Sequence, residues 1–289
     1  MAPPPRRSIV ELIAGGVLDA ELAGLAWLLV EARLPLVVAG LHQGAGKTTL
    51  FEALLDFLPP TARRVDLAGE EEDFAWLPEA EALAWPARER RDASPAIPIT
   101  PATGYLVAAE LSDHLPAYTW GRAARTLVRA ASVGYGIGAT IHADRLEDVH
   151  DLLRSAPVGL TDDELSHLGL VLIVRAEPGP GDPVRRRVVA AHYARPVGRD
   201  EHGHTQRLPP AVLASRAAGA ADLDHFAWGV MPELAIRLGR RAGDLEREVA
   251  ERSAVLATLA ASGTTGVDDV RTAIRDARRL TAPAIERLH

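Results

Sequence analysis

Apolar residues recur at helical spacing over residues 8–31, and a short, uninterrupted apolar run follows. Gly15 and Gly16 divide the first segment into two pieces. The run at 34–39, with the sequence LPLVVA, has no polar position, which is typical of a strand buried on both faces. A glycine-rich stretch comes next, and helical spacing returns over 48–57. The pattern predicts a helical lead-in, a buried strand, a glycine-rich loop and a helix.

Apolar runs and helically spaced residues continue to alternate through the middle of the chain. Strands are expected at 105–109 and 138–142, and helices at 120–131 and 146–153. Residues 78–101 contain several prolines and a charged run, and we expect a surface loop with some helix there. Strands that alternate with helices predict a parallel sheet covered by helices.

The pattern changes near residue 170. Two apolar runs, at 170–175 and 186–192, flank the turn sequence EPGPGD and predict a hairpin. The arginines at 185–187 are expected on the exposed side of its second strand, where they could also bind an acidic partner. Residues 195–210 are polar and are expected to form a linker. From residue 211 onward the apolar positions predict helices.

Composition narrows the class of protein. The chain of 289 residues is 47% hydrophobic and 25% charged, as expected of a globular protein with a substantial core. It has no cysteine, which excludes a disulfide framework, a cysteine-ligated metal site and a thiol nucleophile. The formal net charge is −7, so we do not expect a protein that binds nucleic acid through many phosphate contacts.

The basic residues are almost all arginine. Lysine and arginine together number 32, and the only lysine is Lys47, in the sequence GAGKTT. Arginine presents a planar fork of donors, whereas lysine is a compact point charge. A lone lysine at this place indicates a site that requires an ammonium group.

The sequence around this lysine has the centre of a P-loop, G-x-x-x-x-G-K-[ST], between a predicted strand and a predicted helix. Lys47 would reach the β- and γ-phosphates, and the Thr48 hydroxyl would hold Mg²⁺. The first glycine of the pattern is replaced by Leu41, with Gly40 one place earlier. The alternative is a glycine-rich turn that binds no nucleotide. The residues expected to bind the nucleotide are Gly44, Ala45, Gly46, Lys47, Thr48 and Thr49.

Acidic residues and a histidine follow other predicted strands. Glu110 ends the strand YLVAA, where it could hold Mg²⁺ through water or orient an attacking water, or simply face solvent. Asp113 is a weaker candidate for the same work. His142 ends the next strand, a place where histidine is more often structural than catalytic. Glu70 and Glu71 belong to an acidic run that either faces solvent or reaches the phosphates from the same sheet edge.

The glycine-rich loop, the strand that ends in Glu110 and the sequence TIHA follow one another along the chain. In this order they resemble the motifs of the motor ATPases of type II and type IV secretion, type IV pili and archaeal flagella. The segment ending in GAGKTTLFEAL is similar to the family's approach to its Walker A motif. YLVAAELS is similar to its Walker B stretch and assigns the family's glutamate to Glu110. GATIHADRLEDV resembles its His box, which assigns His142, and its Asp box would fall near Glu70 and Glu71. The resemblance covers roughly residues 8–195 and 228–278.

The resemblance implies an α/β fold in two domains. A RecA-like P-loop NTPase core would span residues 1–205, with the helical lead-in at 8–31. A C-terminal helical domain would span 206–289. It also implies a shortened member of the family that lacks the large N-terminal domain.

The function implied is binding and hydrolysis of Mg-ATP by a secretion or pilus-type motor ATPase. Lys47, Glu110 and His142 would be the catalytic residues, with ATP and Mg²⁺ as cofactors. Thr48 and Glu110 would hold the metal, directly or through water. Family members form hexameric rings, so a homo-oligomer is expected, together with a membrane platform protein of a secretion or pilus machine as partner.

Other functions stay open because the sequence departs from the family pattern. Ser112 stands where the family has arginine, Ala109 replaces a glycine, and Leu41 interrupts the P-loop. These departures favour a slow ATPase or a regulatory or structural relative with little or no hydrolysis. A small-molecule kinase is another alternative, although no acceptor motif is apparent. We expect a cytoplasmic protein, if anything peripheral at the inner face of the membrane, because no apolar run of about 20 residues and no signal peptide is apparent.

Overall fold

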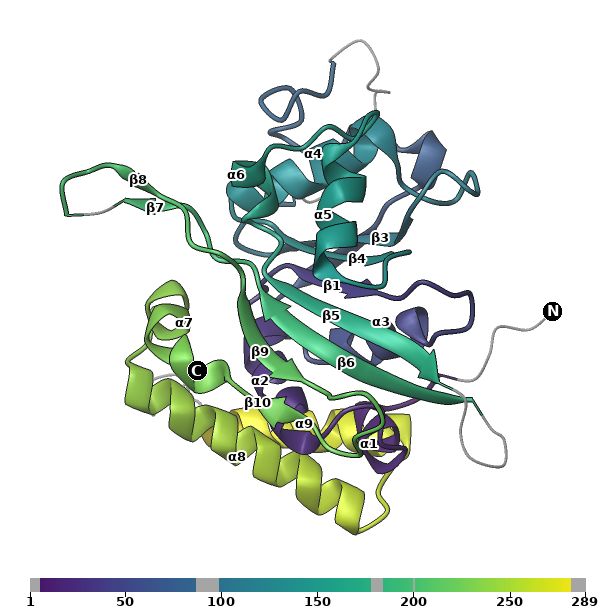
Figure 1. Cartoon of the computed structure of the whole chain (residues 1–289), viewed down its shortest axis with the longest axis vertical. Helices are drawn as coiled ribbons and strands as arrows, with labels where there is room; N and C mark the ends of the chain where they lie inside the picture. Colours follow the sequence, from purple (N-terminus) through teal and green to yellow (C-terminus); the bar gives the residue numbers. More distant parts are fainter. Residues whose placement is uncertain (1–5, 87–98, 178–183, 200, 282–289) are drawn as a thin grey trace.

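The computed structural model describes residues 6–86, 99–177, 184–199 and 201–281. Within them, the chain forms a mixed α/β fold with a mostly parallel central sheet (Figure 1). The strands of this sheet are β1 (Leu36–Ala39), β2 (Arg63–Asp66), β3 (Gly104–Leu111), β4 (Gly136–Ile141), β5 (Leu170–Glu177), β6 (Arg185–Tyr193), β9 (Ala211–Ser215) and β10 (Asp224–His225). The helices are α1 (Ile9–Ala14), α2 (Ala20–Glu31), α3 (Lys47–Leu55), α4 (Gly121–Ser132), α5 (Leu146–Arg154), α6 (Asp162–Leu165), α7 (Met231–Arg237), α8 (Ala242–Ala261) and α9 (Val267–Thr281), with 3₁₀ turns η1 (Gly69–Glu71) and η3 (Ala227–Gly229).

The strand order is β10-β9-β6-β5-β1-β4-β3-β2. The five strands from β5 to β2 are parallel, whereas β6, β9 and β10 pair antiparallel beside them. Strand β1 lies between β4 and β5. The strands that follow β1 in the sequence, β2 to β4, are on one side of it, and β5 is on the other. Such a reversal of strand order opens a crevice at the carboxyl ends of the strands, and ligands bind there in open α/β sheets.

Side chains of β1 alternate between two helical layers. Leu36 and Val38 belong to a core shared with α1, α2 and α3, and Val37 and Ala39 to a core shared with α4 and α5. All four are buried, because helices cover both faces of this part of the sheet (Figure 1). The uninterrupted apolar run is thus explained by a central parallel strand.

The helical lead-in is confirmed. Ser8 caps α1 by accepting a hydrogen bond from the backbone of Glu11, and Asp19 caps α2 in the same way through Leu22. Gly16 has a φ of 69°, and the break between the helices falls there.

The prediction of helix from residue 211 onward is wrong at its beginning. Residues 211–215 form β9, which pairs with β6 and carries β10 on its other edge. Strand β9 covers an edge of β6 that would otherwise present unpaired backbone groups. The expected linker contains a short ribbon, β7 (Gly198–Arg199) with β8 (Thr205–Gln206), which projects from the sheet (Figure 1). The hairpin of β5 and β6 is confirmed, although residues 178–183 of its turn lie outside the described residues.

Helices α8 and α9 pack against the N-terminal helices. Leu245 and Leu256 of α8 and Ile274 of α9 belong to the same apolar core as Leu22 and Leu29 of α2. Helix α8 contacts both α1 and α2, so helices from the two ends of the chain pack together on one side of the sheet (Figure 1). A division into two folding units near residue 206 stays a prediction.

A search of the described residues for a helix both long and apolar enough to cross a bilayer finds none.

Candidate functional site

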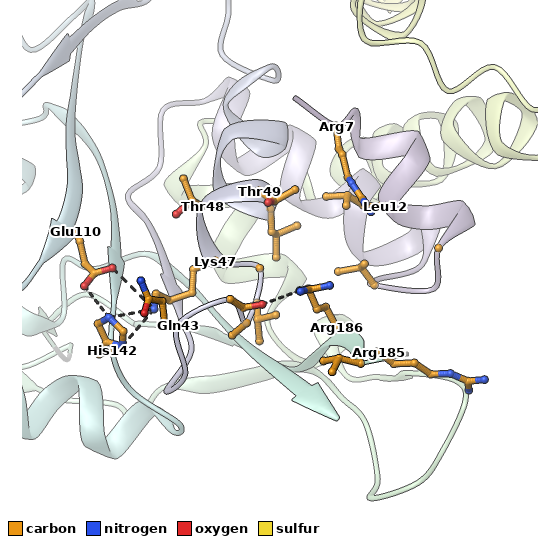
Figure 2. A pocket seen from close by; sticks show the side chains of 18 of the residues that line it. Arg7, Leu12, Gln43, Lys47, Thr48, Thr49, Glu110, His142, Arg185 and Arg186 are labelled. Atoms are coloured by element: carbon orange, nitrogen blue, oxygen red, sulfur yellow. Dashed lines mark hydrogen bonds and ion pairs between the residues drawn. The ribbon is translucent and has the colours of Figure 1, made fainter. Parts of the chain in front are cut away.

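The predicted site residues lie at the carboxyl edge of the parallel strands. Strands β1, β4 and β3 are neighbours in the sheet. The predicted P-loop, residues 40–47, follows β1 and is called the P-loop below, while His142 and Glu110 lie at the ends of β4 and β3. Figure 2 shows the side chains that surround the resulting cavity. The parallel register thus brings together Lys47, Glu110 and His142, which are far apart in the sequence.

The P-loop runs from the end of β1 to the first residue of α3. Gly44 and Gly46 have φ angles of 83° and 97°, a left-handed conformation that glycine adopts without a steric penalty. Gly46 is the N-cap of α3, and no side chain caps the helix there. The free amides of this first turn and the positive end of the helix dipole are therefore directed at whatever occupies the loop.

The replacement of the first P-loop glycine by leucine does not strain the loop. Leu41 is 49% exposed and is not among the residues with positive φ. The glycine that this loop requires is Gly40, because an added Cβ would lie 2.8 Å from the carbonyl oxygen of Val174 and 3.1 Å from Cγ of Lys47. The displaced glycine in the sequence is therefore a packing requirement of this chain.

Lys47 lies beneath the loop, and its side chain is 6% exposed. Its Nζ donates to the carbonyl oxygen of Gly40 at 3.1 Å and lies 3.9 Å from Oε2 of Glu110. Both ring nitrogens of His142 are 3.4 Å from Nζ (Figure 2). Burial lowers the pKa of the Lys47 ammonium, and the charge of Glu110 partly opposes this shift.

A bulge at the end of β3 turns Glu110 inward. The register between β3 and β4 shifts between Ala108 and Leu111, and the carbonyl oxygen of Ala109 accepts a hydrogen bond from the Thr140 hydroxyl at 2.7 Å. Ala109 is exposed in consequence, whereas Glu110 is only 7% exposed. Bulges commonly re-aim a side chain beside a functional site.

The Glu110 carboxylate meets the ring of His142. Its Oε1 lies 2.8 Å from Nε2 of His142, but the two groups are not aligned as a hydrogen bond, and Oε1 is buried without such a partner. The other ring nitrogen of His142, Nδ1, is 3.0 Å from the carbonyl oxygen of Leu41. The histidine therefore contacts both the P-loop and the end of β3.

The cavity above these residues has a volume of about 960 Å³. The P-loop residues Gly44, Ala45, Gly46, Lys47, Thr48 and Thr49 all line it. Thr48 is exposed and Thr49 is half-buried. Helix α1 and the segment before it close one side of the cavity, where Arg7 and Leu12 contribute (Figure 2). The cavity thus contains every residue predicted to bind the nucleotide.

Two arginines at the beginning of β6, Arg185 and Arg186, are exposed as predicted and also line this cavity. Nε of Arg186 donates to the carbonyl oxygen of Gly44 at 2.6 Å, and a Cβ at Gly46 would lie 3.0 Å from Cδ of Arg186. Arg185 lies beside it, whereas Arg187 points elsewhere and donates to Ala220 (Figure 2). Because β5 runs parallel to β1, the end of β5 and the beginning of β6 lie at the same edge of the sheet as the P-loop.

His114 is a further cavity residue that sequence reasoning missed. It lies in the loop after β3, and its ring meets that of His142 edge to face, with 5.9 Å between the centroids. Its Nδ1 is 2.8 Å from the Ser112 hydroxyl oxygen, which also accepts from the backbone amide of His114. Asp113 points instead into a second cavity, of about 440 Å³.

The acidic run does not reach the P-loop cavity. Glu70 lines the second cavity, and Glu71 is exposed and lines neither. The buried member of the run is Glu72, whose carboxylate accepts hydrogen bonds from the backbone amides of Ala68 and Phe74 and from the Trp76 indole. Glu72 thus stabilises the turn that follows β2.

Comparison with known proteins gives a distant likeness among solved structures. No family model and no curated protein matches the sequence. Among solved structures, the chain is similar to the VirB11 ATPase of the Brucella suis type IV secretion system, determined in complex with sulphate. The two are 22% identical, the TM-score is 0.37, and the match covers 57% of this chain and 50% of the other. The chain thus matches about half the length of that protein.

Proposed function

We propose that this chain binds and hydrolyses Mg-ATP. The observation that carries the proposal is the convergence of Lys47, Glu110 and His142 at the base of one cavity, beneath a loop whose two left-handed glycines lead into a helix N-terminus. An ammonium, a carboxylate and an imidazole, each from the end of a different parallel strand, fit a reaction at a polyphosphate.

The phosphates would bind to the P-loop. Free amides at the beginning of α3 and the helix dipole attract negative charge, and the Lys47 ammonium neutralises it at close range. Arg186 holds the carbonyl of Gly44 and adds positive charge at the mouth of the cavity. In the described structure, Lys47 contacts Gly40, Glu110 and His142, and phosphate oxygens would compete for the same ammonium protons.

The donor set fits Mg²⁺. Thr48 supplies an exposed hydroxyl and Glu110 a carboxylate oxygen that has no aligned hydrogen bond, and oxygen ligands are those that Mg²⁺ prefers. When bound with the nucleotide, Mg²⁺ supplies charge neutralisation at the transferring phosphoryl group.

Turnover would require a water held in line with the γ-phosphate. Glu110 would accept a proton from that water or orient it. His142 would hold the Glu110 carboxylate in place and contact the phosphate. The His142 contact with the Leu41 carbonyl ties this group to the P-loop, so the presence of a γ-phosphate would be communicated to β4.

We further propose that the parallel strands form a RecA-like core and that the chain works as a homo-oligomeric motor ATPase of the secretion and pilus type. The strand order around β1, the position of the P-loop after it, and the TIHA sequence at the end of β4 support this. A hexamer, a membrane platform partner, a place at the inner face of the membrane and a C-terminal helical domain belong to the same proposal.

The test is phosphate release from the full chain with Mg-ATP, compared with Glu110→Gln, while nucleotide binding is measured on both. We expect binding in both proteins and a loss of turnover of about 100-fold in the variant, because the isosteric amide cannot accept a proton. Thr126→Ser, a buried change away from the cavity, serves as the control.

A second candidate is a nucleotide-binding regulator that does not turn over. The close contacts of the Glu110 carboxylate with both Lys47 and His142 favour it, because a carboxylate engaged in this way is less available to water. Binding without phosphate release in the wild-type chain would support the regulator. Absence of nucleotide binding would contradict both candidates.

A further inference from the structure

Two imidazoles and a carboxylate meet at the edge of the P-loop cavity. Glu110, His114 and His142 each offer a ligand atom, and these atoms all lie within 4.8 Å of one another. We propose that these three residues form a binding site for a borderline-soft divalent cation of the Zn²⁺ class. The site is separate in chemistry from a Mg²⁺ site, because nitrogen ligands dominate it.

The orientation of His142 presents a lone pair to the site. The carbonyl oxygen of Leu41 can only accept a hydrogen bond, so Nδ1 at 3.0 Å carries a proton toward it. In that tautomer the lone pair is on Nε2, which lies 2.8 Å from Oε1 of Glu110 and 3.4 Å from Nζ of Lys47. A divalent cation bound beside these two acceptors would contact both of them.

The carboxylate provides the second, independent observation. Oε1 of Glu110 belongs to a side chain that is 9% exposed, and this atom has no aligned hydrogen bond. A buried carboxylate oxygen left in this way carries a desolvation cost. The other oxygen, Oε2, lies 3.9 Å from Nζ of Lys47, and the same ammonium is 3.4 Å from both ring nitrogens of His142.

His114 completes the ligand set from the loop after β3. Ser112 holds Nδ1 of its ring at 2.8 Å, and the hydroxyl is itself fixed by the His114 amide. Ligating histidines commonly have their other ring nitrogen bonded in this way, which sets the ring orientation. In the tautomer whose Nδ1–H donates to the Ser112 oxygen, Nε2 has the lone pair that would bind a metal.

The geometry fits tetrahedral coordination after a small movement. Zinc bonds of about 2.0–2.1 Å place neighbouring ligand atoms roughly 3.3 Å apart, so the ligand atoms must approach by about 1.5 Å at most. His114 is exposed and lies on a loop, and it can make this movement without disturbing the core. Two histidines, one glutamate and an open fourth position form a known type of zinc site.

A bound cation would inhibit turnover, because it would occupy the groups proposed to act on water. This consequence rests on the proposed function, whereas the binding itself does not. The nearby Lys47 ammonium repels a cation and lowers its affinity, so the site is expected to empty readily with a chelator.

The test is metal binding by the full chain, prepared without a histidine tag and stripped with a chelator. Co²⁺ is titrated while its visible absorption is recorded, and Zn²⁺ is then added to displace it. We expect one equivalent of tetrahedral Co²⁺ that Zn²⁺ displaces, and binding at least about tenfold weaker in His114→Gln. The matched control is His202→Gln with His204→Gln, an exposed histidine pair outside the cavity, which should leave that equivalent unchanged.

Equal affinity in the wild type and in His114→Gln would overturn the site, and so would loss of the bound equivalent in the control pair. Absence of any binding would also overturn it. A circular dichroism melt of each variant establishes that it is folded. Where phosphate release is measurable, Zn²⁺ should inhibit the wild type at concentrations about tenfold lower than His114→Gln. A protein that binds Co²⁺ through His114 but releases no phosphate would support the metal site and contradict the ATPase.

Discussion

Two ionic clusters in this molecule contain similar side chains but have different roles: one lies beside a cavity, and the other connects three helices. One joins Lys47, Glu110 and His142 at the edge of the sheet. The other joins Glu31 of α2 to Arg252 of α8 and Arg278 of α9. Nη2 of Arg252 donates to Glu31 at 2.8 Å, and Nε of Arg278 lies 2.7 Å from its other oxygen.

The clusters differ in what surrounds the charges. Both arginines of the helical cluster lie over the ring of Trp27, at 5.4 and 6.0 Å from its centroid, so their charges are held between a carboxylate and an indole. Each cluster has a buried atom without an aligned hydrogen bond, Oε1 of Glu110 in one and Nε of Arg252 in the other, but of the two only the P-loop cluster lines the cavity. Charges enclosed among packed helices hold the fold together, whereas charges beside a cavity are available to a ligand.

The largest expected effect comes from breaking the helical cluster. Glu31→Ala removes the carboxylate between the two guanidinium groups and leaves Arg252 with its longer contact to Glu248, at 3.3 Å, and we expect a loss of about 3 kcal/mol in the free energy of unfolding. Urea unfolding measures it. Asp268→Ala, which removes an exposed partner of Arg271 at 3.6 Å, should cost less than about 0.5 kcal/mol. Nucleotide affinity of the folded Glu31→Ala protein should stay at the wild-type value, and a large fall would show that the two clusters are not independent.

A clash beneath the P-loop should have the next largest effect. Gly40→Ala places a Cβ 2.8 Å from a backbone oxygen, so we expect a loss of about 2 kcal/mol in stability and a weaker nucleotide affinity. Leu41→Gly is the control, since Leu41 is exposed and free of left-handed strain. Thermal melts and nucleotide titrations of both variants check this. A larger effect at Leu41 than at Gly40 would contradict the loop geometry described here.

Removal of a cavity arginine should be milder. Arg186→Ala removes the hydrogen bond to the Gly44 carbonyl and one positive charge near the phosphates, and we expect a Kd for Mg-ATP raised about fivefold. Arg187→Ala, on the same strand but outside the cavity, is the matched control. Equal changes in the two variants would mean that the effect is one of net charge.

The smallest effect concerns a half-exposed pair between β10 and α2. A hydrogen bond from Nε2 of His225 to Asp19, at 2.8 Å, raises the pKa of His225, and burial partly opposes the shift. The resulting stability is complete below the unfolded pKa of about 6.5 and is lost as the pH rises through the higher folded pKa. We expect less than about 1 kcal/mol, seen as a difference between wild type and His225→Gln at about pH 5.5 that disappears near pH 8.5. A difference that grows with pH would contradict the assignment.

Elements with a simple pattern of apolar or glycine residues could be predicted from the sequence. The LPLVVA run predicted β1, and the glycine-rich stretch after it predicted a phosphate loop that the geometry fits. The sequence was insufficient for β9, because the five residues 211–215 are too few to distinguish a strand from the helices that follow. Tertiary pairing with β6 decided the outcome there.

The site shows a similar division. Lys47, Glu110 and His142 could be found because Glu110 and His142 lie at the ends of apolar strands and Lys47 ends the glycine-rich loop after another. Arg186 and His114 could not, since their positions depend on where the antiparallel hairpin and the loop after β3 fold back over the cavity. For Glu70 and Glu71 the sequence left two alternatives open, and the structure agrees with the solvent-facing one, because both are exposed and neither lines the P-loop cavity.

The most direct measurement of the central claim is Mg-ATP binding by the full chain beside Lys47→Ala, with phosphate release followed in the same samples. Lys47 is buried beneath the loop and is the only lysine of the chain, so no other ammonium side chain can replace it. We predict binding and turnover in the wild type, and a loss of at least about 100-fold in turnover in a variant that stays folded. Equal nucleotide binding and turnover by the two proteins would contradict the account.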